Sequence, residues 1–300
     1  MNRAIPRTGL LLLLAGLLAL AACGGSDKAS SETSAKERLG SVKPLSSAQT
    51  SVALRIFFDN APPSVGDKLE LTFNGPLRNN GADKLPSLDW KVAFSGLTTS
   101  FASRIVSTGD NFFINLGGQR FEAGQQAVAR LTEQAQASKQ KGLAQIGLNP
   151  LAAIKNVKKA GTRTFKGTKL TVYTGAVDPD AVMYQYERLS QSLPTTGAAA
   201  AVPQGRLTPQ QRAQVKRTFG NPRFEAAVAG DDTVRQLSLT SKFQTPAGNK
   251  DAAGGITGGR IEYRIEYTDV GKPVTITPPA NTQPIGDFAR ELQRILAKRG

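Results

Sequence analysis

The stretch RIEYRIEYT, residues 260–268, alternates apolar and polar side chains without a break. Successive side chains of a β-strand point to opposite faces, so this pattern predicts a strand with one buried and one solvated face. KLELTFN (68–74) and LDWKVAF (88–94) follow the same rule. One-sided strands of this kind are typical of an antiparallel sheet that packs on one side only.

Other segments with strand-like patterns occur along most of the chain, and their connections are short and rich in Gly, Asn, Asp and Pro. Parallel pairing would need a crossover after nearly every strand, so we expect antiparallel pairing of about ten strands. AGDDT (229–233) should form a turn between two of them. The remaining candidate strands are 51–58, 97–107, 111–116, 168–177, 223–229, 233–243 and 272–277.

Helices are expected where an N-cap residue precedes a proline at the first helical position. The pairs Asn149-Pro150, Asp178-Pro179 and Thr208-Pro209 provide this signal. We also expect a polar helix at about 123–141 and an amphipathic one at 287–299, with a loop at 195–205. The sequence therefore predicts an α+β fold, in which helices pack on the apolar face of one large twisted antiparallel sheet.

The N-terminus predicts export and lipidation. A short basic start precedes an apolar run at 9–20, which has the length of a signal-peptide core. The following Leu20-Ala21-Ala22-Cys23 is similar to the bacterial lipobox, in which the cysteine is acylated and becomes the first residue of the mature protein. Several acyl chains give stable membrane anchoring. We therefore expect Cys23 to hold the protein on the extracytoplasmic face of the cell membrane.

Four segments are expected on this basis. Residues 1–22 form a signal peptide, and the polar residues 23–48 form a lipidated flexible tether. Residues 49–284 form the folded domain, which precedes a C-terminal amphipathic helix at 285–300.

Charge narrows the choice of partner. Without the two arginines of residues 1–22, the chain keeps 36 of its 38 basic residues against 23 acidic ones, a net charge of +13. An exported lipoprotein lies beside anionic headgroups rather than nucleic acid, so we expect a membrane partner and no nucleic acid. Six basic residues without an intervening acid could dock on those headgroups, or form a solvated helix end and strand face: Lys155, Lys158, Lys159, Arg163, Lys166 and Lys169.

Catalytic chemistry has few candidates. The chain contains no histidine, and its one cysteine is assigned to lipidation, which excludes a histidine-based triad, a thiol nucleophile and the usual zinc sites. The acidic pairs Asp178 with Asp180 and Asp231 with Asp232 have simpler explanations as a helix cap and a turn. We therefore expect no catalytic residue, no metal and no cofactor.

The order of the segments resembles the LppX/LprAFG family of actinobacterial lipoproteins, which are relatives of the LolA and LolB carriers. The stretches with this resemblance are GDNFFINLGGQRFE (109–122), GTKLTVYTGAVD (167–178) and YTDVGKPVTITPP (267–279). The resemblance implies a curved half-barrel with helices on its concave side and an apolar cavity between them. It also implies that the protein binds or transfers lipids or acylated molecules in the envelope, with a transport protein as a possible partner.

The alternate apolar residues of the three clearest predicted strands are the candidate lining of this cavity. From the residues alone, the same side chains could equally form a dry packed core. If these side chains line a cavity, the protein is a lipid carrier. If they form a packed core, it is a surface lipoprotein that binds or senses another protein. We expect a monomer in both cases. The candidates are Leu69, Leu71, Phe73, Trp90, Val92, Phe94, Ile261, Tyr263 and Ile265.

Overall fold

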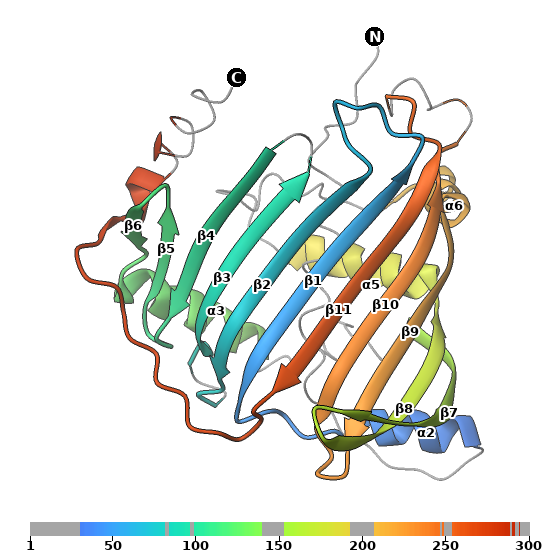
Figure 1. Ribbon diagram of the computed structural model, residues 1–300, viewed down its shortest axis with the longest axis horizontal. Coiled ribbons are helices and arrows are strands. Elements are labelled where there is room, and N and C mark those ends of the chain that lie inside the picture. Colours follow the sequence, from blue (N-terminus) through green and yellow to red (C-terminus); the bar gives the residue numbers. More distant parts are fainter. Residues whose placement is uncertain are drawn as a thin grey trace.

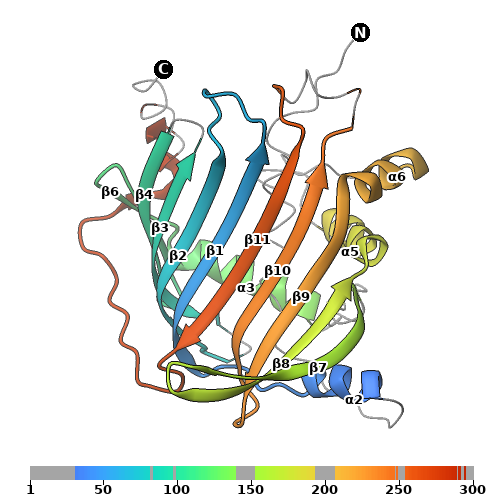
Figure 2. The same cartoon turned by 45° about the vertical axis from the view of Figure 1, so that its right-hand side comes forward.

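One sheet of twelve strands dominates the computed structural model of the chain. The structure describes residues 31–81, 84–96, 99–139, 153–192, 207–246, 248, 254–288, 290, 291 and 294. The sheet is strongly curved, and the helices α3 and α5 lie on one of its faces (Figures 1 and 2). The predicted α+β class with one large curved antiparallel sheet and helices on one face is confirmed.

The strand order shows how the two halves of the chain meet. The sheet runs β12-β6-β5-β4-β3-β2-β1-β11-β10-β9-β8-β7, so the first six strands step outward from β1 and the later ones return from the far edge to β11 beside β1. Every pair is antiparallel except β12 with β6. The strands are β1 (Ser47–Asp59), β2 (Lys68–Arg78), β3 (Ser87–Gly96), β4 (Thr99–Ser107), β5 (Phe112–Leu116), β6 (Gln119–Glu122), β7 (Ile154–Phe165), β8 (Thr168–Val177), β9 (Phe219–Ala229), β10 (Val234–Gln244), β11 (Gly258–Thr268) and β12 (Gln283–Pro284).

The helices begin where the sequence signals them. α5 (Pro179–Ser192) starts after Asp178, whose carboxylate accepts a hydrogen bond from the Asp180 N–H at 3.0 Å. α6 (Pro209–Thr218) has a complete capping box, because Thr208 and Gln211 each accept a bond from the other's backbone N–H. The remaining described helices are α2 (Ser31–Gly40), α3 (Gln125–Lys139) and the short 3-10 helix η5 (Ile285–Asp287).

Two predicted elements are wrong. The helix expected after Asn149-Pro150 is replaced from Ile154 onward by β7, which forms a hairpin with β8. Pairing with the neighbouring strand β8 satisfies the backbone hydrogen bonds of β7, and this hairpin overrides the helix signal at Asn149-Pro150. The strand expected at 272–277 is irregular. Pro273 within it and Pro278 directly after it have no N–H group to donate to a neighbouring strand.

The predicted flexible tether is too long. Residues 31–40 form α2, which packs beside β7, with Ala35 and Leu39 buried in the main core. Arg38 forms an ion pair with Asp232 in the β9–β10 turn, and Lys36 Nζ donates to the Ile154 carbonyl oxygen at 3.0 Å. The mostly polar composition of the segment did not predict this helix. Two buried apolar side chains and two polar side-chain contacts are enough to hold it against the domain. Only residues 24–30 then separate the predicted anchor, Cys23, from the fold.

The C-terminal segment returns to the opposite edge of the sheet (Figure 1). Arg120 Nη1 donates to the Ala280 carbonyl oxygen at 2.9 Å, and β12 then pairs with β6. The Phe288 ring lies edge-on to Phe121, with centroids 5.6 Å apart. Most of the predicted helix at 287–299 and the whole predicted loop at 195–205 lie outside the described residues.

We predict that α2 contributes to the stability of the domain. Leu39→Ala should lower the free energy of unfolding by about 2–4 kcal/mol, because it removes a buried side chain and leaves a cavity. Ser41→Ala, at an exposed position just after the helix, should change it by less than about 0.5 kcal/mol. Urea denaturation of both variants measures the difference. An equal effect of the two would show that α2 is not docked.

Candidate functional site

The inner face of the sheet, which the helices cover, is apolar across at least five neighbouring strands. On β1, Val52, Leu54 and Ile56 face Phe73, Leu71 and Leu69 of β2. On the other side of β1, the same three residues pair with Ile265, Tyr263 and Ile261 of β11. Cross-strand partners in an antiparallel pair share one face, so these nine side chains form a continuous apolar surface.

The surface continues through β3 and β4. Phe73 pairs with Val92, and Leu71 pairs with Phe94, which in turn faces Phe101. The Phe73 and Trp90 rings meet edge-on at 5.9 Å, and the Phe94 and Phe101 rings stack at 5.4 Å. The structure therefore brings all the predicted cavity residues to one face of the sheet: Leu69, Leu71, Phe73, Trp90, Val92, Phe94, Ile261, Tyr263 and Ile265.

The two halves of this face differ in burial. Ile261, Tyr263 and Ile265 on β11 are buried in the main core, together with the apolar residues of β1. On β2 and β3, Leu69, Leu71, Phe73, Trp90 and Phe94 are only half-buried, and Phe101 on β4 is 41% exposed. Helices α3 and α5 cross this side of the sheet (Figures 1 and 2). The β2–β4 part of the inner face therefore remains an accessible apolar surface, which we call the open apolar face.

Three polar atoms lie buried on the same face. The Tyr263 hydroxyl, the Thr50 hydroxyl and Trp90 Nε1 find no hydrogen-bond partner among the described residues. Tyr263 and Thr50 are only 4% and 5% exposed, and burial raises the pKa of the Tyr263 hydroxyl above its ordinary value. Each group keeps its proton at neutral pH and can donate it to an oxygen of a bound molecule. Sequence reasoning identified Tyr263 and Trp90 as apolar lining but missed this polar role, because unpaired groups are recognisable only from their surroundings.

The predicted anionic-surface residues lie on the β7–β8 hairpin, not at a helix end. Lys155 is paired with Asp178 at 2.6 Å, and Arg163 with Glu225 at 2.7 Å. The other four, which we call the hairpin lysines, are exposed and make no ion pair with the described residues: Lys158, Lys159, Lys166 and Lys169.

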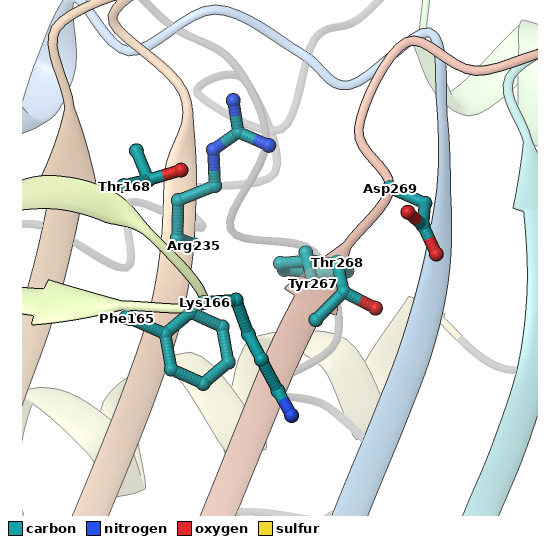
Figure 3. Close-up of a pocket in the computed structure, with 7 residues that line it drawn as sticks. All are labelled: Phe165, Lys166, Thr168, Arg235, Tyr267, Thr268 and Asp269. Carbon is teal, nitrogen blue, oxygen red and sulfur yellow. The ribbon is translucent and has the colours of Figure 1, made fainter.

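A pocket of about 320 Å³ lies where the hairpin turn meets the start of β10 and the end of β11 (Figure 3). It is lined by Phe165, Lys166, Thr168, Arg235, Tyr267, Thr268 and Asp269. The charged ends of Lys166, Arg235 and Asp269 point in different directions (Figure 3). Arg235 is already paired with Asp231, and Asp269 with Lys272. Of the predicted site residues this pocket contains only Lys166, and its polar groups do not converge.

The acidic residues considered for catalysis all have structural partners. Asp178 caps α5 and binds Lys155, which lowers the pKa of its carboxyl group. Asp180 pairs with Lys216. Asp232 pairs with Arg38, which lowers its pKa. Burial would raise the pKa of Asp231, but hydrogen bonds from Thr233 outweigh it and the pKa is lowered. The lowered pKa values keep Asp178, Asp231 and Asp232 ionised at neutral pH, which does not suit a general acid.

Two further searches concern the described part of the chain only. No group of three or more His, Cys, Asp or Glu residues there could hold a metal ion. No helix there is long and apolar enough to cross a membrane. The predicted lipobox residues Leu20, Ala21, Ala22 and Cys23 lie outside the described residues.

Comparison with solved structures finds proteins that are similar to this chain in fold. No family model matches the chain, and no curated protein matches it. LprF from Mycobacterium bovis is 13% identical, with a TM-score of 0.40 over 84% of this chain and 94% of that one. The lipoprotein LppX from Mycobacterium tuberculosis is 12% identical, with a TM-score of 0.37 over 82% and 94%. A LolA superfamily protein from Nitrosomonas europaea is 10% identical, with a TM-score of 0.21 over 82% and 96%.

The chain is similar to LppX and LprF in fold. These are members of the group that the sequence resembles.

We predict that the Tyr263 hydroxyl does not stabilise the ligand-free protein. Tyr263→Phe should leave the free energy of unfolding unchanged or raise it by about 1 kcal/mol, because it removes a buried hydroxyl that has no partner. Tyr173→Phe, on the same inner face, provides a buried tyrosine for comparison. Urea denaturation measures both. A loss of more than about 1 kcal/mol in Tyr263→Phe would mean that the hydroxyl is hydrogen-bonded.

Proposed function

We propose that this protein is an exported lipoprotein that binds acyl chains on the open apolar face, between the sheet and its helices. The observation that supports this most strongly is the partial exposure of Leu69, Leu71, Phe73, Trp90 and Phe94 beneath helices. In a filled core these side chains would be as buried as Ile261 and Ile265, which lie on the same face.

The energetics favour a hydrocarbon ligand. Removing apolar surface from water contributes roughly 25 cal/mol per Å², or about 0.8 kcal/mol per CH₂ group. An acyl chain laid across β2, β3 and β4 would bury its own methylenes and also the half-exposed rings of Phe73, Trp90 and Phe94. The open apolar face therefore fits a chain-like apolar ligand better than a compact polar one.

The unpaired polar groups add a second element to this site. A bare hydrocarbon leaves the hydroxyls of Tyr263 and Thr50 and the indole N–H of Trp90 unsatisfied. Trp90 lies on the open apolar face itself, so a lipid with an oxygen along its chain could accept a hydrogen bond from its indole N–H. The site suits an amphipathic lipid or an acylated molecule.

The location follows from the N-terminal prediction. Acylation of Cys23 would place the protein on the extracytoplasmic face of the cell membrane, next to the pool of acyl lipids that it is proposed to bind. The role is then holding or transferring such lipids in the envelope, without catalysis. The engagement of Asp178, Asp180, Asp231 and Asp232 in caps, turns and ion pairs agrees with this role.

Native ligand can be sought directly. The chain purified from membranes should release a stoichiometric lipid into organic solvent, identified by mass spectrometry. Absence of lipid, together with no uptake of a fluorescent fatty acid, would instead favour the filled-core protein-binding module.

We predict that a charge on the open apolar face blocks uptake. Leu71→Glu should weaken binding of a fluorescent fatty acid at least about tenfold, because bound hydrocarbon would desolvate the carboxylate. Ala93→Glu adds the same charge at an exposed position on the adjacent strand and should bind normally. Leu71→Trp, which fills space without charge, should also weaken uptake. Circular dichroism checks that all three variants fold, and equal affinities in them would contradict the site.

A further inference from the structure

The end of the molecule that contains α2 and the β7–β8 hairpin has an excess of positive charge. Figures 1 and 2 both show α2 beside β7 and β8 at one end, with α6 near the other. The hairpin contains six basic residues and no acid between Ile154 and Val177. Two of them are neutralised by Asp178 and Glu225, which leaves the four hairpin lysines.

Neighbouring carboxylates do not cancel this charge. Asp232 is paired with Arg38 and Lys43, Asp231 with Arg235, and Asp269 with Lys272. Each of these three acids is therefore already matched by at least one basic residue. The hairpin lysines remain as an exposed positive surface on the last strands of the sheet.

The attachment of α2 limits how far this surface can lie from the anchor. Leu39 is buried in the same core cluster as Val157 of β7, and Lys36 binds the Ile154 carbonyl oxygen. The start of the fold is thus held beside the hairpin. Seven residues lie between Cys23 and Ser31, so even a fully extended chain spans at most about 29 Å between the two. This shorter connection keeps the α2 end of the domain closer to the predicted anchor than a tether of residues 23–48 would.

We infer that the hairpin lysines dock on the anionic headgroups of the membrane that holds the acylated Cys23, so that the α2 end of the domain faces the bilayer. Near-surface lysines are attracted to anionic lipid within about one Debye length. The short connection raises the local concentration of headgroups at the hairpin. The inference rests on the proposed anchor but not on lipid binding by the open apolar face.

The single cysteine allows this geometry to be tested. The chain from residue 23 keeps every described element, and its Cys23 can be coupled to a maleimide lipid in vesicles. Acetylation of lysines, followed by mass spectrometry, then reports which amines are covered. With phosphatidylglycerol in the vesicles, the hairpin lysines should react at least about fivefold more slowly than exposed Lys91 and Lys242. Equal rates, or the same pattern on pure phosphatidylcholine, would overturn the inference.

Matched variants separate a local surface from net charge. The uncoupled chain with Cys23→Ser should float with phosphatidylglycerol vesicles, and this binding should weaken at high salt. Replacing the four hairpin lysines by glutamine should reduce the partition at least about tenfold. Replacing Lys84, Lys91, Arg217 and Lys242 by glutamine removes the same charge elsewhere and should reduce it much less.

Equal losses in the two variants, or no flotation of the parent chain, would overturn the inference. Uptake of a fluorescent fatty acid should be unchanged in the hairpin variant. Loss of docking with normal uptake would therefore leave the proposed lipid-binding function standing, and failure of uptake in the parent chain would not affect the docking result.

Discussion

The apolar face of a single curved sheet must be shielded from water, and the rest of this structure follows from how that is done. Around β1 and β11 the apolar side chains pack into a closed core with Ala35 and Leu39 of α2. Toward β2, β3 and β4 the same face continues, but its side chains stay half-exposed. Exposed apolar area is unfavourable in proportion to its size. The inner face is therefore tightly packed around β1 and β11, and its apolar side chains on β2, β3 and β4 remain accessible to another molecule.

The joining of the two halves of the chain at β1 and β11 keeps this asymmetry in place. β1 pairs with β2 on one side and with β11 on the other, through registers of eleven residues each. The closed core therefore extends from the central strands β1 and β11, which are distant in sequence, to β7 at the edge of the sheet. The early strands β2–β4 extend from it as one meander, and α2 packs at the opposite edge, beside β7. The proposed site and the proposed membrane-facing end lie on opposite sides of the central strands.

Polar groups divide in a similar way. Most ion pairs lie on exposed or half-exposed side chains, where they contribute little to stability and serve mainly to hold turns and helix ends. The unpaired hydroxyls of Tyr263 and Thr50 lie on the inner face instead. Burial of a polar group without a partner is costly, so such groups in a folded protein call for an explanation. An amphipathic ligand is the explanation that the surrounding apolar side chains favour.

The alternation in 260–268, 68–74 and 88–94 was sufficient to predict three strands and the side chains that share one face of each, and the short connections predicted antiparallel pairing. The period of two is a local property and depends only on the geometry of the strand. Capping at Thr208 and Asp178 was predictable for the same reason, because both partners lie within three residues.

The tertiary structure alone decided that Ile154 begins a strand, that Leu39 is buried and that the hairpin lysines lie beside the start of the fold. It also decided which apolar side chains are covered and which remain accessible. The docking of α2 depends on contacts between segments more than a hundred residues apart, such as Lys36 with Ile154 and Arg38 with Asp232. Such contacts leave no local sequence pattern, because the segments that make them come together only in the folded chain.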